Sequence, residues 1–183
     1  MIVRPTLETA RLILRPYTQA DISELVPLIG TREVAATTLR IPHPYTEQDG
    51  RAFLEMAREG NRIWLAITRC SDGRQIGGMG LTVDEQHQHA ELGYWLGVPF
   101  WRHGYASEAA REMLRYGFED LGLHRIFASH FKHNPASGNV LRKIGMQHEG
   151  CQREHIQKWG EFVDSELYGI LRSEWETSGK EGA

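Results

Sequence analysis

A strand that leads almost directly into a long amphipathic helix limits the possible folds of this chain more than any other feature. Alternate residues from Ala90 to Leu96 are apolar and share one face, which is typical of a strand. After a short turn, the apolar side chains of residues 104–121 recur at helical spacing along one stripe. Because each element has one apolar face to bury, the pair predicts a layered fold of helices on a sheet.

Turn signals divide the rest of the chain into short apolar segments. Strands are predicted at 11–15, 63–67, 75–83, 90–96 and 125–131, with two more within 146–172 joined near Lys158, Trp159 and Gly160. Helices are predicted at 19–29, 46–59, 104–121 and 134–144, the last of them with Asn134 as its N-cap, and prolines make a loop of residues 41–45. This order predicts an α/β or α+β sandwich built on a mixed sheet.

Size and composition point to one folded unit. The 183 residues are 40% hydrophobic and 25% charged, which excludes a chain too polar to fold. We see no repeat, low-complexity segment or Pro/Ser-rich linker. We therefore expect a single domain over residues 1–183, with about 176–183 as a disordered tail.

Charge and cysteine usage restrict the partners and the compartment. A net charge of −3 provides no general basic field for nucleic acid. No apolar run approaches the ~18 residues that span a bilayer, and residues 1–5 lack the apolar core of a signal peptide. Cys70 and Cys151 are isolated, so a reduced, cytoplasmic protein is favoured over one with a single bridge between them.

The histidines do not form a recognisable metal motif. His87 and His89 share one face of a strand, and His130 and His133 are a second close pair. Neither pair has Cys or carboxylate companions at a ligand spacing, so we expect no metal site.

The turn between the strand and the long helix is the best candidate for a binding site. The first turn of a helix carries unpaired backbone N–H groups and the positive end of the helix dipole. Gly104 and Ala106 are small enough for a ligand to approach the backbone, and Arg102 adds positive charge. A diphosphate fits such a site, although an ordinary strand-to-helix turn explains the same glycine. The nearby cluster Gly77, Gly78 and Gly80 indicates a strand bulge or a place of close packing.

Several motifs in this order resemble one enzyme family. The segment Trp101-x-x-Gly104-x-Ala106 resembles the acetyl-coenzyme A signature of the GNAT N-acetyltransferase superfamily. Residues 8–16, 91–96, 134–146 and 171–175 are similar to stretches of its RimJ/RimL-like branch, which acetylates ribosomal proteins. The superfamily often has Gln or Arg where Trp101 stands, which removes one side-chain contact and leaves the backbone role intact.

This resemblance implies a fold and a set of cofactor contacts. The expected fold is a mixed, mostly antiparallel seven-stranded sheet with a splay between its fourth and fifth strands, flanked by about four helices. Acetyl-CoA would be the acetyl donor, with its pantetheine arm along Leu96 to Val98. The expected cofactor-binding residues are Leu96, Val98, Arg102, His103, Gly104, Tyr105, Ala106, Ser107 and Asn134.

The chemistry of acyl transfer suggests two catalytic residues. An attacking amine must lose a proton, which a carboxylate takes directly or through one water. Glu91 is the candidate, although a solvated glutamate at a strand edge is the alternative. The leaving thiolate needs a hydrogen bond or a proton, and the matching helix offers Ser137 instead of the tyrosine found in many relatives. Ser137 could also simply support the first turn of its helix.

Several functions remain open at this point. We expect an N-acetyltransferase for a primary amine, preferably a protein or peptide N-terminal α-amine. A small-molecule amine such as an antibiotic or polyamine is the close rival. Two other classes are a non-catalytic module that senses acyl-CoA and a nucleotide-binding domain without acyl chemistry. A homodimer is expected by family analogy alone.

Overall fold

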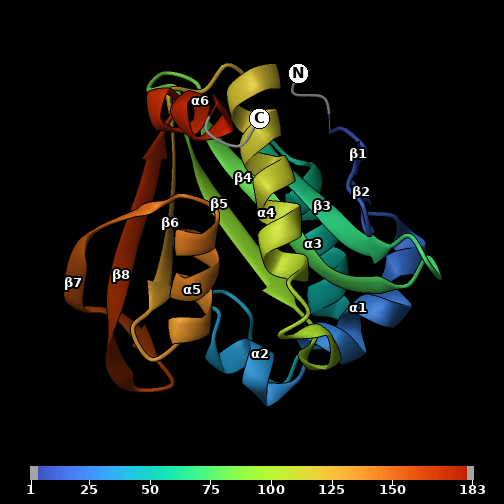
Figure 1. The fold of residues 1–183 in the computed structure, drawn as a ribbon. Coiled ribbons are helices and arrows are strands. Elements are labelled where there is room, and N and C mark those ends of the chain that lie inside the picture. Colours follow the sequence, from blue (N-terminus) through green and yellow to red (C-terminus); the bar gives the residue numbers. More distant parts are fainter. Residues whose placement is uncertain (1–3, 181–183) are drawn as a thin grey trace.

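The computed structural model describes residues 4–180 and contains one eight-stranded sheet with helices on both faces (Figure 1). The strands are β1 (Leu7–Glu8), β2 (Leu12–Pro16), β3 (Arg62–Arg69), β4 (Gln75–Asp84), β5 (His89–Leu96), β6 (Arg125–Phe131), β7 (Gln147–Lys158) and β8 (Glu161–Leu171). The α-helices are α1 (Ile22–Ile29), α2 (Arg32–Ala36), α3 (Glu47–Arg58), α4 (Tyr105–Arg115), α5 (Pro135–Lys143) and α6 (Arg172–Lys180).

The strands lie in the order β1-β2-β3-β4-β5-β6-β8-β7. Every neighbouring pair is antiparallel except β5 and β6, which are parallel because α4 carries the chain from one to the other. The strands β3 and β4 form a hairpin, and so do β7 and β8, which were predicted to join near residues 158–160. The mixed, mostly antiparallel sheet is therefore confirmed.

Strand alternation produces two apolar cores, one on each face of the sheet. On the first face α4 and α5 pack on the sheet, and buried side chains such as Met113, Leu141 and Leu92 belong to this core. On the second face α1, α2 and α3 pack around Tyr17, Ala66 and Trp95. Figure 1 shows α4 and α5 in front of the sheet and α1 and α3 on its other side.

The glycines of β4 mark both a bulge and a place of close packing, the two alternatives that the sequence predicted. The register of β3 against β4 shifts between Ile67 and Thr68, which marks a bulge beside Gly77. A Cβ on Gly78 would lie 1.9 Å from the Tyr17 hydroxyl oxygen and 2.7 Å from Trp95 Nε1. The cluster is thus a site of close packing as well as a bulge.

The structure corrects the expected element counts within residues 4–180. It has eight strands where seven were expected and six α-helices where about four were expected. The additional β1 and α2 span two and five residues, too few to establish a periodicity. The expected helix 104–121 divides into α4 and a π-helical turn at Tyr116–Asp120.

The C-terminal segment also differs from expectation. The tail predicted from about residue 176 is helical as far as Lys180, as the continuation of α6, and residues 181–183 lie outside the described residues. The Trp175 ring lies 5.9 Å from that of Phe118 between centroids, which packs α6 on the first core. Among the helices of residues 4–180, none combines the length and the apolar character that a membrane span requires.

Candidate active site

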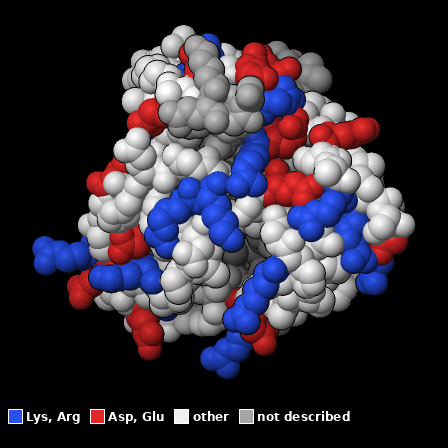
Figure 2. All heavy atoms as spheres, viewed as in Figure 1, with Lys and Arg blue, Asp and Glu red and all other residues white. Residues whose placement is uncertain are grey.

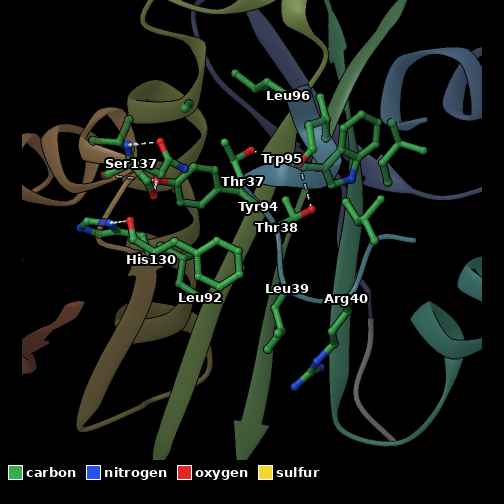
Figure 3. Close-up of a pocket in the computed structure, with 18 of the residues that line it drawn as sticks. Thr37, Thr38, Leu39, Arg40, Leu92, Tyr94, Trp95, Leu96, His130 and Ser137 are labelled. Atoms are coloured by element: carbon green, nitrogen blue, oxygen red, sulfur yellow. Dashed lines mark hydrogen bonds between the residues drawn. The ribbon is translucent and has the colours of Figure 1, made fainter. Parts of the chain in front are cut away.

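The parallel strands β5 and β6 separate soon after they meet, and a cavity opens where they part. Their pairing covers His89 to Glu91 on β5 and Arg125 to Phe127 on β6. Beyond Glu91, β5 continues to pair with β4 on its other side as far as Leu96. The predicted splay therefore lies between β5 and β6. The adjoining cavity has a volume of about 1180 Å³, and Figure 3 shows residues of β5, β6, α5 and the segment after α2 around it.

The start of α4 forms one wall of this cavity. Gly104 precedes the helix with φ 81° and ψ 0°, a left-handed conformation that glycine adopts without steric cost. No side chain caps the helix there, so the amides of its first turn remain available. Arg102 is also left-handed, at φ 64°, and its side chain is exposed. The predicted strand–turn–helix segment is present, and residues 102–107, called the cradle below, line the cavity with the exception of His103.

The N-terminal segment fixes the cradle from outside. Glu108, in the first turn of α4, accepts hydrogen bonds from Thr9 Oγ1 at 2.6 Å and from the Arg11 backbone N–H at 2.9 Å. The Arg11 guanidinium pairs with the same carboxylate and also donates to the His103 carbonyl at 3.1 Å. Burial opposes ionisation of Glu108, but these hydrogen bonds hold its pKa below the usual value. The negative charge near the helix N-terminus is thereby neutralised by Arg11.

Trp101 has a structural task in this turn. Its indole Nε1 donates to the Leu96 carbonyl at 2.8 Å, which ties the turn back to the end of β5. The Leu96 carbonyl, expected to help hold a pantetheine arm, therefore already accepts one hydrogen bond. The Trp101 side chain thus stabilises the turn through this hydrogen bond, in place of the cofactor contact that Gln or Arg would offer at this position.

Glu91 is the last residue of β5 that pairs with β6. It therefore lies at the fork, the point where the two strands begin to separate. It stands opposite Thr82 in the β4–β5 register, half-buried, and lines the cavity. Among the interactions of residues 4–180, no hydrogen bond or ion pair occupies its carboxylate. A carboxylate without a partner at the point where two strands part can accept a proton from a bound molecule.

Ser137 meets a partner that the sequence analysis did not identify. The Tyr94 hydroxyl oxygen lies 2.6 Å from Ser137 Oγ, so a side chain of β5 reaches across the splay to α5 (Figure 3). Burial raises the pKa of Tyr94 to about 12, which keeps its proton on the hydroxyl at neutral pH. The alternation of residues 90–96 predicted only that Tyr94 lies on the apolar face of its strand. Its position opposite the gap could be found only once the register of both strands was known.

Asn134 caps α5 as predicted, because its Oδ1 accepts from the Ser137 backbone N–H at 3.3 Å. Most of the residues predicted for the site line this one cavity: Glu91, Leu96, Arg102, Gly104, Tyr105, Ala106, Ser107, Asn134 and Ser137. Val98 and His103 are not among its lining residues. Val98 packs instead against the second core, and His103 Nδ1 lies 2.7 Å from the Trp101 carbonyl.

The half of the cavity beyond Glu91 is mainly aromatic and aliphatic. Its walls come from α2, α3 and the segment between them, and from the second face of β3 to β5. Trp64 lies in an edge-to-face pair with Phe53, with ring centroids 5.8 Å apart. Trp64 is only half-buried and lines the cavity.

Charged groups are distributed unevenly around the cavity. Figure 2 shows Lys and Arg side chains beside a hollow on the face that α4 and α5 share. Arg111 belongs to α4, and Arg142 and Lys143 end α5. Lys143 lines the cavity, whereas Arg142 donates to the Tyr168 hydroxyl at 2.7 Å and to Asn139 at 2.6 Å. The face next to the cradle is therefore suited to an anionic molecule.

Within residues 4–180 the structure contains no group of three or more His, Cys, Asp or Glu side chains arranged to hold a metal ion. The His87 and His89 rings stack with centroids 5.9 Å apart. Cys70 and Cys151 are both free and exposed, so the bridge considered between them is not formed.

Comparison with known proteins shows which family this chain is similar to. Residues 11–147 match the family model described as the acetyltransferase (GNAT) domain. An uncharacterized N-acetyltransferase, YoaA of Bacillus subtilis, is 34% identical over 172 residues, which cover 92% of this chain and 97% of YoaA. The putative ribosomal N-acetyltransferase YdaF of the same organism is 33% identical over 106 residues, covering 57% of this chain and 58% of YdaF.

A solved structure has the same fold at low sequence identity. It is the microcin C7 self-immunity acetyltransferase MccE in complex with acetyl-CoA and AMP. The match has a TM-score of 0.79 at 19% identity and covers 89% of this chain and 93% of that one.

Proposed function

This chain belongs to the acetyltransferase (GNAT) family and is an acyltransferase, and we propose that it moves the acetyl group of acetyl-CoA to a primary amine, preferably a peptide N-terminal α-amine. One observation carries the proposal: a splayed strand pair and an uncapped helix N-terminus open into the same cavity, with a free carboxylate at the fork. A nucleotide site without acyl chemistry would not need the splay or the carboxylate.

The residues present fit acetyl-CoA. The uncapped amides of α4 and the exposed Arg102 suit a diphosphate, and the basic face beside them suits a further phosphate. Within residues 4–180, the edge of β5 from Leu92 to Leu96 has no neighbouring strand and, apart from the Leu96 carbonyl that accepts from Trp101, offers backbone groups to an amide-containing arm. A complex of MccE with acetyl-CoA, on the same fold, agrees with this assignment. When bound, acetyl-CoA supplies the thioester that is attacked.

Glu91 is proposed to take the proton of the acceptor amine, directly or through one water. An α-amine has a pKa near 8 and a lysine amine near 10.4, so an α-amine needs less help at neutral pH. The Glu91 carboxylate has no competing partner and stands beside the open edge of β5. A backbone N–H of that edge is proposed to polarise the thioester carbonyl, as in other oxyanion holes.

Ser137 and Tyr94 are proposed to serve the leaving sulfur. The two hydroxyl oxygens lie 2.6 Å apart, and either hydroxyl can donate. In the proposed arrangement Tyr94 donates to Ser137 Oγ, which leaves the serine hydrogen free to point toward the sulfur. Hydrogen bonds in such a chain strengthen one another in a buried site. The thiolate thus leaves with a hydrogen bond from Ser137 that is reinforced by Tyr94.

The Ser137 and Tyr94 assignments predict a graded loss of turnover. Ser137→Ala should lower kcat by about 10-fold or more, because the sulfur loses its donor. Tyr94→Phe should lower kcat less, about 3- to 10-fold, because Ser137 remains. Wild-type kcat should show no decline up to pH 10, since Tyr94 keeps its proton until about pH 12. Steady-state kinetics at saturating acetyl-CoA checks all three. Equal activity of Ser137→Ala and the wild type would remove Ser137 from the mechanism.

The proposed activity is tested by intact-mass analysis of products. The protein is incubated with acetyl-CoA and a panel of peptides and small amines, with thiol release measured in parallel. The expected result is a mass increase of one acetyl group on at least one amine, with matching release of CoA. Binding of acetyl-CoA without transfer to any amine would instead support the acyl-CoA-sensing module.

The class of the acceptor amine, the cellular location and the oligomeric state remain predictions. The name of YdaF, a putative ribosomal N-acetyltransferase, supports a peptide acceptor, and a small-molecule amine is the alternative. A cytoplasmic location and a homodimer also remain predictions. Native mass spectrometry tests the dimer directly.

A further inference from the structure

One aromatic ring lies beside the candidate base and identifies the kind of acceptor that the cavity suits. In the sheet, Trp64 of β3 pairs with Gly80 of β4, and Gly80 pairs with Gly93 of β5. A Cβ on Gly80 would lie 2.7 Å from the Trp64 ring, and one on Gly93 would lie 3.0 Å from it. The indole therefore lies across two glycines that leave room for it.

The same row of the sheet places this ring next to Glu91. Glu91 and Gly93 are two residues apart on one strand, so they share a face at a spacing of about 7 Å. Because Trp64 covers Gly93, its ring adjoins the position from which the Glu91 side chain rises. An amine held at Glu91 would have the substituent on its neighbouring carbon atoms against the indole.

Neighbouring aromatic side chains hold the ring in place. Phe53 of α3 packs edge-on against Trp64, and Tyr17 packs edge-on against Phe53 with centroids 5.2 Å apart. Trp64 is nevertheless half-buried, and it lines the cavity together with Ile29, Val34, Ile41 and Tyr45. This half of the cavity thus presents a fixed, flat apolar surface.

The charges available on this side suit one positive group. The second acidic residue of the lining, Asp49, is ionised, but its Oδ2 already accepts from the Thr46 N–H at 2.7 Å and the Thr46 hydroxyl at 2.6 Å in the capping box of α3. Arg40 is exposed and adds positive charge instead. A polyamine, with several cations along its length, would meet only two carboxylates in the described lining, those of Glu91 and Asp49, and that of Asp49 is already engaged in the capping box. Glu91 is the one acidic lining residue of residues 4–180 without a hydrogen bond.

We propose that the acceptor is a primary amine with a single charge that carries an aromatic or large aliphatic group within two carbon atoms of the nitrogen, and that Trp64 selects it. A peptide that begins with such a residue meets this description. The inference rests on the proposed function, because it assigns the acceptor of the same site. It adds a specificity-determining residue and a substrate class.

The test compares peptides that differ only in the first residue and carry no cationic side chain, Phe-Gly-Gly-Gly and Ala-Gly-Gly-Gly, with spermidine as a third substrate. The expected kcat/KM for the Phe peptide exceeds that for the Ala peptide by about 10-fold or more, as apolar pockets commonly discriminate. Trp64→Ala should reduce this ratio to about one, and Trp64→Phe should keep most of it. Trp159→Ala is the matched control, because Trp159 is 52% exposed and does not line the cavity.

A binding measurement separates this inference from the proposed function. Phenethylamine and ethylamine are titrated into the protein saturated with CoA, and circular dichroism verifies that each variant is folded. Tighter binding of phenethylamine that depends on Trp64 supports the inference even if no amine is acetylated, a result that would contradict the proposed function alone. Equal binding and equal turnover of the paired amines, or preference for spermidine, overturns the inference and leaves the acetyltransferase proposal standing.

Discussion

Replacing Glu91 with Gln is expected to lower kcat by about 10²- to 10⁴-fold, the range typical of a lost general base. The amide has nearly the same shape as the carboxylate but cannot take the proton of the attacking amine. Because Glu91 lies at the fork and not in the cradle, the affinity for acetyl-CoA should stay within about 2-fold of the wild type. Steady-state kinetics and calorimetric titration measure the two quantities separately.

The pH dependence gives this prediction a second readout. With a peptide α-amine, the defect of Glu91→Gln should narrow between pH 7 and pH 9, because the amine loses its proton to water as the pH passes its own pKa near 8. Glu85→Gln is the matched control, since Glu85 is exposed in the turn between β4 and β5 and does not line the cavity. Glu91→Gln at wild-type rates would show that another group accepts the proton.

Replacing Gly104 with Val should weaken binding of CoA by about 10- to 100-fold. Valine strongly disfavours the left-handed conformation that Gly104 adopts at φ 81°, so the turn must change and the amides at the start of α4 must move. Each hydrogen bond to a charged group contributes about 1.5–3 kcal/mol, so misplacing one accounts for that loss. Calorimetric titration with CoA gives the affinity directly.

A second left-handed glycine controls for the backbone strain of this substitution. Gly160, at φ 88° in the turn between β7 and β8, has no atom within 4 Å of a Cβ placed on it. Gly160→Val should lower thermal stability by a similar amount and leave CoA binding unchanged. Equal CoA affinity in Gly104→Val and Gly160→Val would contradict the assignment of the cradle.

Local sequence patterns were sufficient for the elements whose chemistry is local. The long helix after Gly104, the cap by Asn134 and the hairpin turn at Trp159 and Gly160 each depend on residues within a few positions of one another. The segments of β2 to β8 likewise followed from alternation, from the continuous apolar run of residues 63–67 and from turn residues. The two-residue β1 could not be found, because its strand character comes from pairing Leu7 with Leu14.

A motif led to the candidate site where its residues are continuous in sequence, and not where the fold brings distant strands together. The expected residues Arg102 to Ser107 form one such block, and all of them except His103 line the cavity. Tyr94 and Ser137 are 43 positions apart, and their hydrogen bond depends on how far β5 and β6 separate. Trp64 meets Gly93 only through the register of three strands. No spacing within the sequence gives these contacts.

The central claim is that the splay and the start of α4 bind coenzyme A, and calorimetric titration of the wild-type protein tests it most directly. CoA should bind at one site per chain with an exothermic signal, and ATP at the same concentrations should bind at least about 10-fold more weakly, because it lacks the arm that would lie along β5. Absence of heat with CoA, or tighter binding of ATP, would contradict the account.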